Sequence, residues 1–213
     1  MGGELIGPVL LAALEQRFTE DFLPPCEAQA IVHPNGFVKL PLARTADGVI
    51  RFFLHVWRSG SEDAAVHDHR WPFASVVLGG ELAHTMMDVA VTSGGVPRGG
   101  PDVGSPGVFD VARYRPGGGE HCFDLSRRER AVISHRRRHV FPVGQSYGME
   151  AFAFHRARAS AGAMTFVARG LPQRPYARVL VEQGGFLPPS RRWRLLEAPE
   201  RRQYLRDALE VLG

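Results

Sequence analysis

Two histidines separated by one residue, His67 and His69, have the spacing in this sequence that best suits metal chemistry. Side chains two residues apart in a β-strand point to the same face, so these two imidazoles would lie side by side. Neighbouring imidazoles can form two adjacent bonds of ~2.0–2.2 Å to a divalent metal ion. The residues from Phe73 to Leu78 are mostly apolar and lead into Gly79-Gly80. The pattern therefore predicts that the histidine pair begins a buried strand and holds a metal ion.

The elements that position this pair are predicted to be short strands between about residues 30 and 170. Thr45-Ala46-Asp47-Gly48 reads as a hairpin turn, and Gly79-Gly80 as another. The predicted strands are 37–42, 49–57, 73–78, 81–91, 108–114, 131–134, 139–143, 149–155 and 164–168. Ser93 to Gly107 is rich in Gly and Pro and reads as a surface loop. Many short strands with turns between them indicate a jelly roll or small barrel.

Both ends of the chain are predicted to be helical. Apolar spacing over residues 3–22 indicates an amphipathic helix, and Arg191–Leu212 reads as a helix that closes one barrel end. We divide the chain into a helical segment (1–29), a β-barrel (30–172) and a C-terminal extension (173–213).

Composition excludes several functional classes. Cys26 and Cys122 are too few and too far apart for a disulfide framework or a thiolate zinc site. No run approaches the ~18 apolar residues of a membrane span, and the N-terminus lacks the pattern of a signal peptide, so a cytoplasmic protein is expected. Of the 26 basic residues all but Lys39 are arginine, the net charge is +4, and the runs 127–130 and 136–138 read as solvated loops. Nucleic-acid binding is not expected.

The segment His67-Asp68-His69-Arg70-Trp71-Pro72-Phe73 resembles the first motif of the cupin superfamily. That motif runs His-x-His, three or four residues, Glu, six residues and Gly. His67, His69 and Gly80 match it, whereas Phe73 stands in place of the Glu. The segment is similar to a bacterial cupin group with a His-Asp-His-x-Trp signature. The resemblance covers roughly residues 37–170 and implies a mainly β fold, a single cupin-type jelly-roll β-barrel with N- and C-terminal flanking helices.

The second cupin motif supplies a further metal-binding histidine from a later strand, and three residues compete for this role. His155 follows a glycine turn and a strand-like run, and a last strand-like run comes after it, so we favour it. His121 fits the motif on paper but lies in a glycine-rich stretch, and His139 follows three arginines. Glu150 is a less favoured fourth ligand.

A site without the Glu would present three neutral imidazoles and leave the full charge of a divalent ion uncompensated. This set resembles that of the thiol dioxygenases among cupins, although their Ser-His-Tyr pattern is not matched around His155. Fe(II) is the favoured metal, and Zn(II), which accepts three histidines plus water, comes next.

Further lining residues follow from the alternation in 51–57. Arg51, His55 and Trp57 share one face, and Phe52, Leu54 and Val56 share the other. If the flanking helices cover the apolar face, Arg51 would bind a substrate carboxylate and His55 would carry protons. The opposite arrangement, with Arg51 and His55 in solvent, stays open. Tyr147 would contact substrate or pack, and His84 has the register to face the cavity.

These observations favour a mononuclear non-haem iron oxygenase acting on a small acidic or amino-acid-derived metabolite. A redox-neutral zinc-type enzyme (isomerase, lyase or N–N bond-forming) and a non-catalytic ligand-binding barrel are the alternatives. The expected partner is a small-molecule substrate, with neither nucleic acid nor membrane, and a homodimer is compatible with the sequence. No residues for an organic cofactor are identified.

Overall fold

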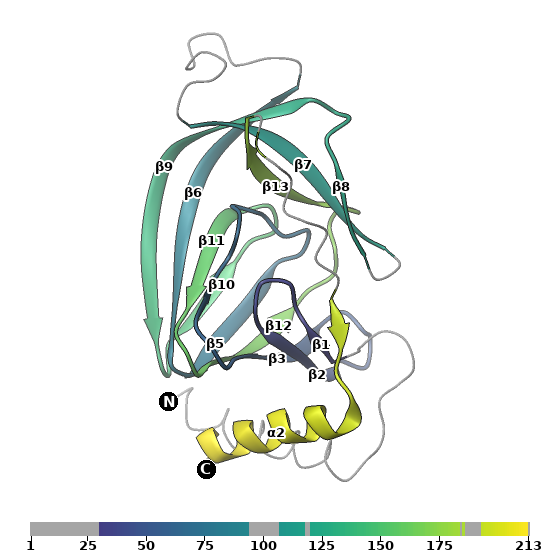
Figure 1. Cartoon of the computed structure of the whole chain (residues 1–213), viewed down its shortest axis with the longest axis vertical. Coiled ribbons are helices and arrows are strands. Elements are labelled where there is room, and N and C mark those ends of the chain that lie inside the picture. The colour runs from purple at the N-terminus through teal and green to yellow at the C-terminus, as the bar shows by residue number, and fades with distance from the viewer. Residues whose placement is uncertain (1–29, 94–106, 118–119, 184, 186–192, 213) are drawn as a thin grey trace.

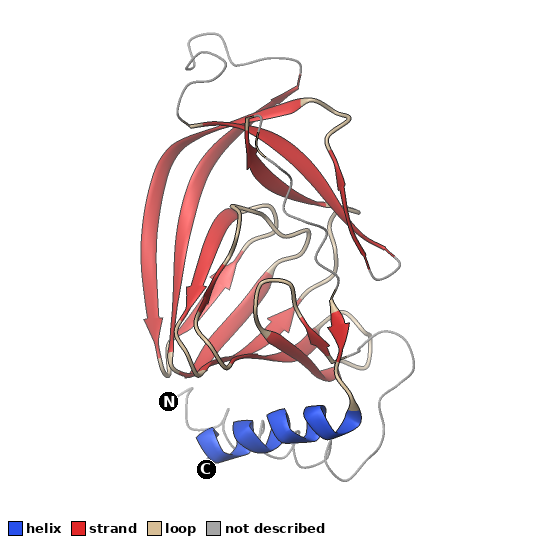
Figure 2. Cartoon of the chain, in the orientation of Figure 1, coloured by secondary structure: helices blue, strands red, loops and turns tan. Residues whose placement is uncertain are grey.

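The computed structural model describes residues 30–93, 107–117, 120–183, 185 and 193–212, and these form mostly strands (Figure 2). In chain order the elements are β1 (Ile31–Val32), β2 (Val38–Arg44), β3 (Arg51–Trp57), β4 (Ser61–Glu62), β5 (Phe73–Gly79), β6 (Glu81–Ser93), β7 (Val108–Gly117), β8 (Glu120–Asp124), β9 (Glu129–Pro142), β10 (Ser146–Met149), β11 (Phe154–Ala159), β12 (Ala163–Arg169), β13 (Ala177–Glu182), β14 (Arg194–Leu195) and α2 (Ala198–Leu212). The mainly β prediction is confirmed.

Two antiparallel sheets contain these strands (Figure 1). The first has the order β10-β5-β12-β3-β2-β1-β14, and the second has the order β13-β7-β9-β6-β11-β4, with β8 added beside β7. Consecutive strands such as β2 and β3 pair as hairpins, whereas β12 inserts between β5 and β3. The first sheet therefore brings together side chains that are more than 100 residues apart in the sequence.

Helix α2 packs on the outer face of the first sheet. Leu205 and Ala208 of α2 are buried with Leu54 and Val56 of β3 and Leu40 of β2. Burial of this apolar face is the main force that holds the helix in place. The predicted helix 191–212 is thus corrected in two respects: α2 begins at Ala198, and it covers a sheet face instead of closing a barrel end (Figure 1).

The second sheet closes into a ring through a short segment that lies between its strands β11 and β13. His67 bridges His155 of β11 on one side and Val179 of β13 on the other. Because β13 pairs β7, β7 pairs β9, β9 pairs β6 and β6 pairs β11, the bridge at Val66–Asp68 completes a ring of strands. Val111, Ala131, Phe154 and Leu180 form an apolar cluster against these strands, with Val66 packed on it.

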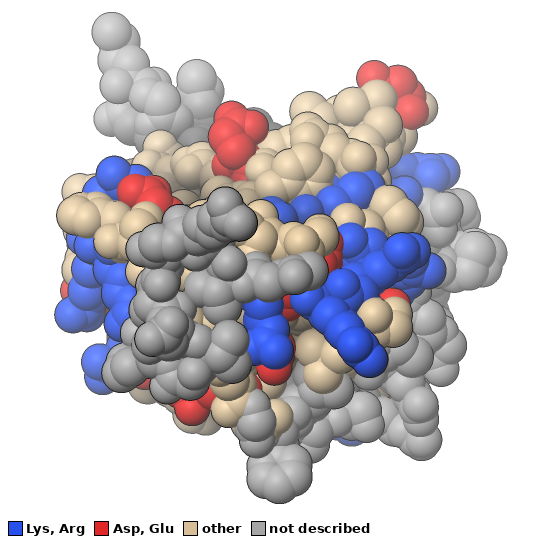
Figure 3. Space-filling model, turned by 90° about the horizontal axis from the view of Figure 1, so that it is seen from above, with Lys and Arg blue, Asp and Glu red and all other residues tan. Residues whose placement is uncertain are grey.

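Strand β9 corrects the prediction of two strands separated by a basic loop. It runs unbroken through Arg136, Arg137 and Arg138, paired with Thr85 to Met87 of β6. These arginine side chains are exposed, so the backbone ladder forms while the charges stay in water. Figure 3 shows Lys and Arg side chains gathered in several groups on the upper face, with Asp and Glu side chains among them.

Other boundaries also differ from the prediction. The predicted strand 149–155 is interrupted by a turn between β10 and β11, where Phe152 has φ 73°. His67 and His69 precede β5 and do not begin it, because Pro72 lies between. Strands β8 and β13 lie where no strand was expected.

The hairpin turn at 45–48 is confirmed, with Gly48 at φ 72° and the amide of Val49 donating to Asp47 Oδ1. The predicted helix at 3–22 and most of the loop 93–107 lie outside the described residues. In the described part of the chain, no helix has the length and apolarity that a membrane crossing requires.

Candidate metal centre

Three histidines from two distant segments meet between the sheets. The ring centroid of His67 lies 5.1 Å from that of His69 and 4.6 Å from that of His155, and the last two are 5.0 Å apart. One ring nitrogen from each lies within 4.8 Å of the other two. Small side-chain rotations bring such nitrogens to the spacing that metal–nitrogen bonds of ~2.0–2.1 Å need. The three residues therefore form a possible metal site.

Backbone hydrogen bonds fix the segment that carries His67. Its amide donates to the carbonyl of His155 over 3.0 Å, and the amide of His155 donates back over 2.9 Å. On the opposite edge, the amide of Asp68 donates to the Arg178 carbonyl and the amide of Leu180 donates to the Val66 carbonyl. Two of the three histidines are thus bonded to each other through their main chains, which sets their separation without any metal.

Polar neighbours orient the His67 ring. Its Nδ1 lies 3.2 Å from the carbonyl oxygen of Ala65 and 3.8 Å from Oδ2 of Asp63. Asp63 is itself held by Asn35 Nδ2 and by the amide of Ala157, each donating over 2.7 Å. A proton on Nδ1 that is donated to these oxygens leaves Nε2 as the ligand atom, which is the usual arrangement of a metal-binding histidine.

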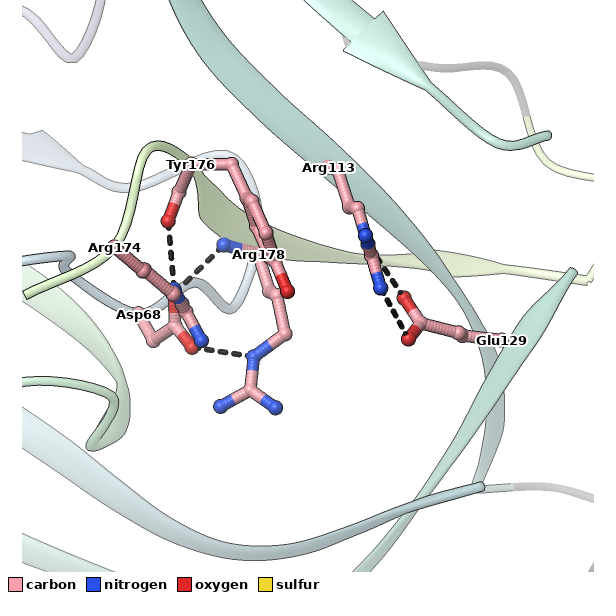
Figure 4. Close-up of polar contacts among 6 residues, drawn as sticks. All are labelled: Asp68, Arg113, Glu129, Arg174, Tyr176 and Arg178. Carbon is pink, nitrogen blue, oxygen red and sulfur yellow. Dashed lines mark hydrogen bonds and ion pairs between the residues drawn. The ribbon is translucent and has the colours of Figure 1, made fainter. Parts of the chain in front are cut away.

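Asp68, between the two histidines, points to the other side of the segment and is completely buried. Its Oδ2 accepts a hydrogen bond from Arg178 Nε over 2.6 Å, and its Oδ1 accepts from the Arg178 amide over 2.7 Å and from Arg174 Nη2 (Figure 4). Both arginines also stack on aromatic rings: Arg174 lies over Phe152 and Arg178 over Phe154. This cluster, which we call the Asp68 clamp, ties the histidine segment to β13.

Burial keeps His69 and His155 in the form that binds metals. Desolvation, followed by the neighbouring histidines, holds the pKa of His69 and of His155 well below 6.5. Both imidazoles are therefore neutral near pH 7, as metal ligation requires. Phe73, at the position of the motif's Glu, places its ring 5.3 Å from the His69 ring. Among the described residues, the cluster thus contains three imidazoles and no carboxylate.

The face of β3 that carries Arg51, His55 and Trp57 points away from α2, since the alternate residues Leu54 and Val56 pack against that helix. The His55 ring lies 4.6 Å from the Phe37 ring, and its Nε2 is buried without a hydrogen-bond partner among the described residues. Burial, helped by the charge of Lys39, lowers the pKa of His55 well below 6.5. His55 is therefore a neutral group on the inner face of the first sheet.

Arg51, at the start of β3, pairs in register with Arg169 of β12. Tyr147, on β10, packs its ring 4.6 Å from Phe141 and 4.8 Å from His84. Burial raises the pKa of Tyr147 to about 12, so its hydroxyl stays protonated at physiological pH. The roles of His55, Arg51 and Tyr147 in catalysis stay predictions.

Two of the competing residues, His139 and Glu150, lie outside the cluster. His139 is exposed on β9 and stacks with Phe141, and Glu150 is exposed in the turn before β11. The backbone of His121 belongs to β8, opposite Pro116, and its side chain is outside the described residues. Of the three histidines considered, the described cluster contains His155.

Residues that the sequence analysis left without a role also lie near the cluster. His84 is 4% exposed, its ring lies 5.1 Å from that of His155, and neither ring nitrogen has a described partner. Lys39 and Arg169 both contact Phe53 on the inner face of the first sheet. The sequence signal for Lys39 was available, because it lies between Val38 and Leu40 in a strand whose apolar face packs against a helix.

No protein-family model matches the sequence, and a comparison with curated proteins finds no relative. Among solved structures, an RmlC-like cupin from Shewanella frigidimarina is 16% identical over 71% of this chain and 90% of that chain, with a TM-score of 0.36. KdgF from Halomonas sp. is 13% identical over 73% and 94%, with a TM-score of 0.36. Oxalate oxidase with bound glycolate is 14% identical over 73% and 61%, with a TM-score of 0.38. Likeness at this level carries no information about function.

Proposed function

We propose that this protein is a metal-dependent enzyme, a mononuclear non-haem iron oxygenase that acts on a small acidic or amino-acid-derived metabolite. The observation that carries the proposal is the group of three imidazoles, His67, His69 and His155, held together by backbone hydrogen bonds. When bound, a ferrous ion at three imidazoles supplies a redox-active centre with open coordination positions.

In this proposal, the residues around the histidines bind the substrate, shield the site from water and exchange protons. Trp71 and Phe73 pack beside His69 and limit the access of water. Arg51 attracts the acidic substrate to the inner face of the first sheet. His55, neutral and with an Nε2 that has no partner among the described residues, accepts a proton from the substrate, and the Tyr147 hydroxyl can donate a hydrogen bond.

His84 favours a second candidate, a redox-neutral enzyme with Zn(II). Burial, with His67 and His139 nearby, lowers the pKa of His84 to about 4, so a neutral base lies against the ligand His155. A base beside three imidazoles suits isomerase, lyase or N–N bond-forming chemistry, in which protons move and O2 is not consumed.

The test is metal analysis of protein purified without oxygen, beside a His67→Ala/His69→Ala double variant and an exposed-histidine control, His139→Ala. Near-stoichiometric iron in wild type and control, lost in the double variant, supports the metal site. O2 consumption with a panel of small carboxylic and amino acids then tests the oxygenase.

Two results contradict parts of the proposal. Activity that survives replacement of iron by zinc, with no O2 uptake, contradicts the oxygenase and favours the redox-neutral enzyme. Absence of metal from all three proteins after reconstitution with Fe(II) and Zn(II) contradicts the metal site itself and leaves a ligand-binding barrel.

A further inference from the structure

Two cations approach the same aromatic ring on the inner face of the first sheet. Lys39 Nζ lies 4.3 Å from the ring centroid of Phe53, and Arg169 Cζ lies 4.7 Å from it. They come from β2 and β12, the strands that flank β3 on either side. Two more cations, Arg51 and Arg70, are close enough to act on the pKa of both groups.

This cluster differs from three other partly buried arginines among the described residues, each of which faces a carboxylate. Arg174 and Arg178 bind Asp68, and Arg113 binds Glu129 through two hydrogen bonds (Figure 4). Around Lys39 and Arg169, by contrast, the charged groups of the described residues that shift the pKa are all cations. The Nε atom of Arg169 is buried and has no hydrogen-bond partner among the described residues.

Cations that are buried together raise the free energy of the folded protein, and none of the described acids forms an ion pair with Lys39 or Arg169. The effect is visible in Lys39, where burial first, and then Arg169, Arg51 and Arg70, lower the pKa to about 7. Burial and two of the same arginines lower the pKa of Arg169 to about 10. An anion placed between Lys39 and Arg169 would relieve this unfavourable arrangement, since it supplies the missing opposite charge.

The cations are connected to the metal centre through aromatic side chains. The guanidinium of Arg169 lies 4.4 Å from the ring centroid of Trp71, and the Trp71 ring lies 5.9 Å from that of His69. Two buried polar atoms on the inner faces of β3 and β12 have no partner among the described residues: His55 Nε2 and Thr165 Oγ1. His55 and Thr165 pair in register across these two strands, so the two atoms belong to one region of the inner face.

We propose that Lys39 and Arg169 form an oxyanion-binding subsite, which holds the carboxylate or phosphate-type group of the substrate against Phe53 while the rest of the molecule reaches the histidines. The assignment rests on the proposed function for the identity of the substrate. It names the acidic end of that substrate and the two side chains that select it. The subsite itself exists without the metal, so the two proposals can fail separately.

The experiment is calorimetric titration of inorganic phosphate, and separately of malonate, into wild-type protein and four variants. Lys39→Met and Arg169→Met each remove one charge of the subsite, and Arg138→Met removes one charge from an exposed position on β9. His67→Ala/His69→Ala removes the metal centre. Whichever anion binds more tightly identifies the substrate as a phosphate-type compound or a carboxylate.

Wild type is expected to bind one equivalent of the preferred anion. Each subsite variant should weaken binding by about tenfold or more, as expected for loss of a charge-assisted hydrogen bond. Arg138→Met and the double histidine variant should bind nearly as wild type does. Arg169→Lys, which retains the charge, should keep most of the affinity and so exclude a purely structural effect of Arg169→Met.

The subsite is overturned if neither anion binds to wild type, or if binding is unchanged in both Lys39→Met and Arg169→Met. Binding that disappears only in the double histidine variant places the anion on the metal and also overturns it. Anion binding at Lys39 and Arg169 in a protein that takes up no metal contradicts the proposed function and leaves the subsite in place.

Discussion

Replacing Asp68 by Asn tests whether the Asp68 clamp holds the histidine segment. The carboxylate is completely buried and accepts three hydrogen bonds, from the side chain and amide of Arg178 and from Arg174. The amide side chain of the variant would keep one acceptor oxygen but would present an NH2 group to an arginine N–H. Both guanidinium groups would then lack their counter-charge. Removal of one partner of a buried ion pair costs about 3–5 kcal/mol.

The matched control is Asp88→Asn. Asp88 pairs with Arg137 on the surface, where the two side chains are 50% and 56% exposed. Screening by water limits such a pair to about 0–1 kcal/mol. In a protein of this length, 3–5 kcal/mol lowers the melting temperature by roughly 6–20 °C, whereas the control should shift it by a few degrees at most.

The assay is urea and thermal denaturation in the presence of a chelator, so that metal binding does not contribute. In a separate experiment, titration with Fe(II) or Zn(II) should show that Asp68→Asn binds the metal about 10–100-fold more weakly than wild type does. This is the usual effect of losing a residue that supports the ligands. Equal losses of stability in Asp68→Asn and Asp88→Asn, within about 1 kcal/mol, would refute the reasoning.

Three further perturbations have defined expectations. Lys39 has its pKa lowered from 10.5 to about 7, so between these values the unfolded chain binds more protons and the free energy of unfolding of wild type rises with pH. Lys39→Met should remove that rise and stabilise the protein most below pH 7, as urea denaturation at pH 6 and pH 10 would measure. Leu205→Ala, at a side chain only 5% exposed, should cost about 2–5 kcal/mol, whereas Val211→Ala, at 52% exposure, should cost little; equal effects would contradict the packing of α2. Gly80→Ala should destabilise the protein more than Gly48→Ala in the same denaturation assay. Both glycines have a positive φ, so both substitutions cause backbone strain. In addition, a Cβ on Gly80 would lie 2.7 Å from Ser160 Oγ, whereas one on Gly48 would meet nothing within 4 Å.

Local patterns in the sequence were enough to predict the two-faced strand β3 and the histidine pair. Alternation in 51–57 separates Leu54 and Val56 from His55, and the structure places the apolar pair against α2. The i, i+2 spacing brings His67 and His69 to one face although their segment precedes β5, because a short extended bridge is enough to hold it. These features depend on neighbours in the sequence, where side-chain periodicity holds.

Features that depend on strand order could not be predicted in this way. Lys39 and Arg169 meet at Phe53 only because β12 inserts beside β3. Asp68 finds its arginines more than 100 residues later, on and before β13. The prediction of a loop at Arg136–Arg138 failed because the low strand propensity of this run is overridden by a long partner, β6, which pairs all three arginines.

The ring closure at His67 has a consequence for local unfolding. The joint is the short segment Val66–Asp68, in which His67 bridges both strands, and the hydrogen-bonded amides of His67 and His155 lie between the histidine cluster and the apolar cluster around Phe154. Opening this joint separates the segment from two strands at once and disperses the histidines, while the long ladder of β6 and β9 can remain intact. Amide hydrogen exchange at His67 and His155 therefore reports the free energy of assembling the metal centre apart from that of the whole fold. A ligand that slows exchange at these two amides, and not along β9, acts on the joint itself.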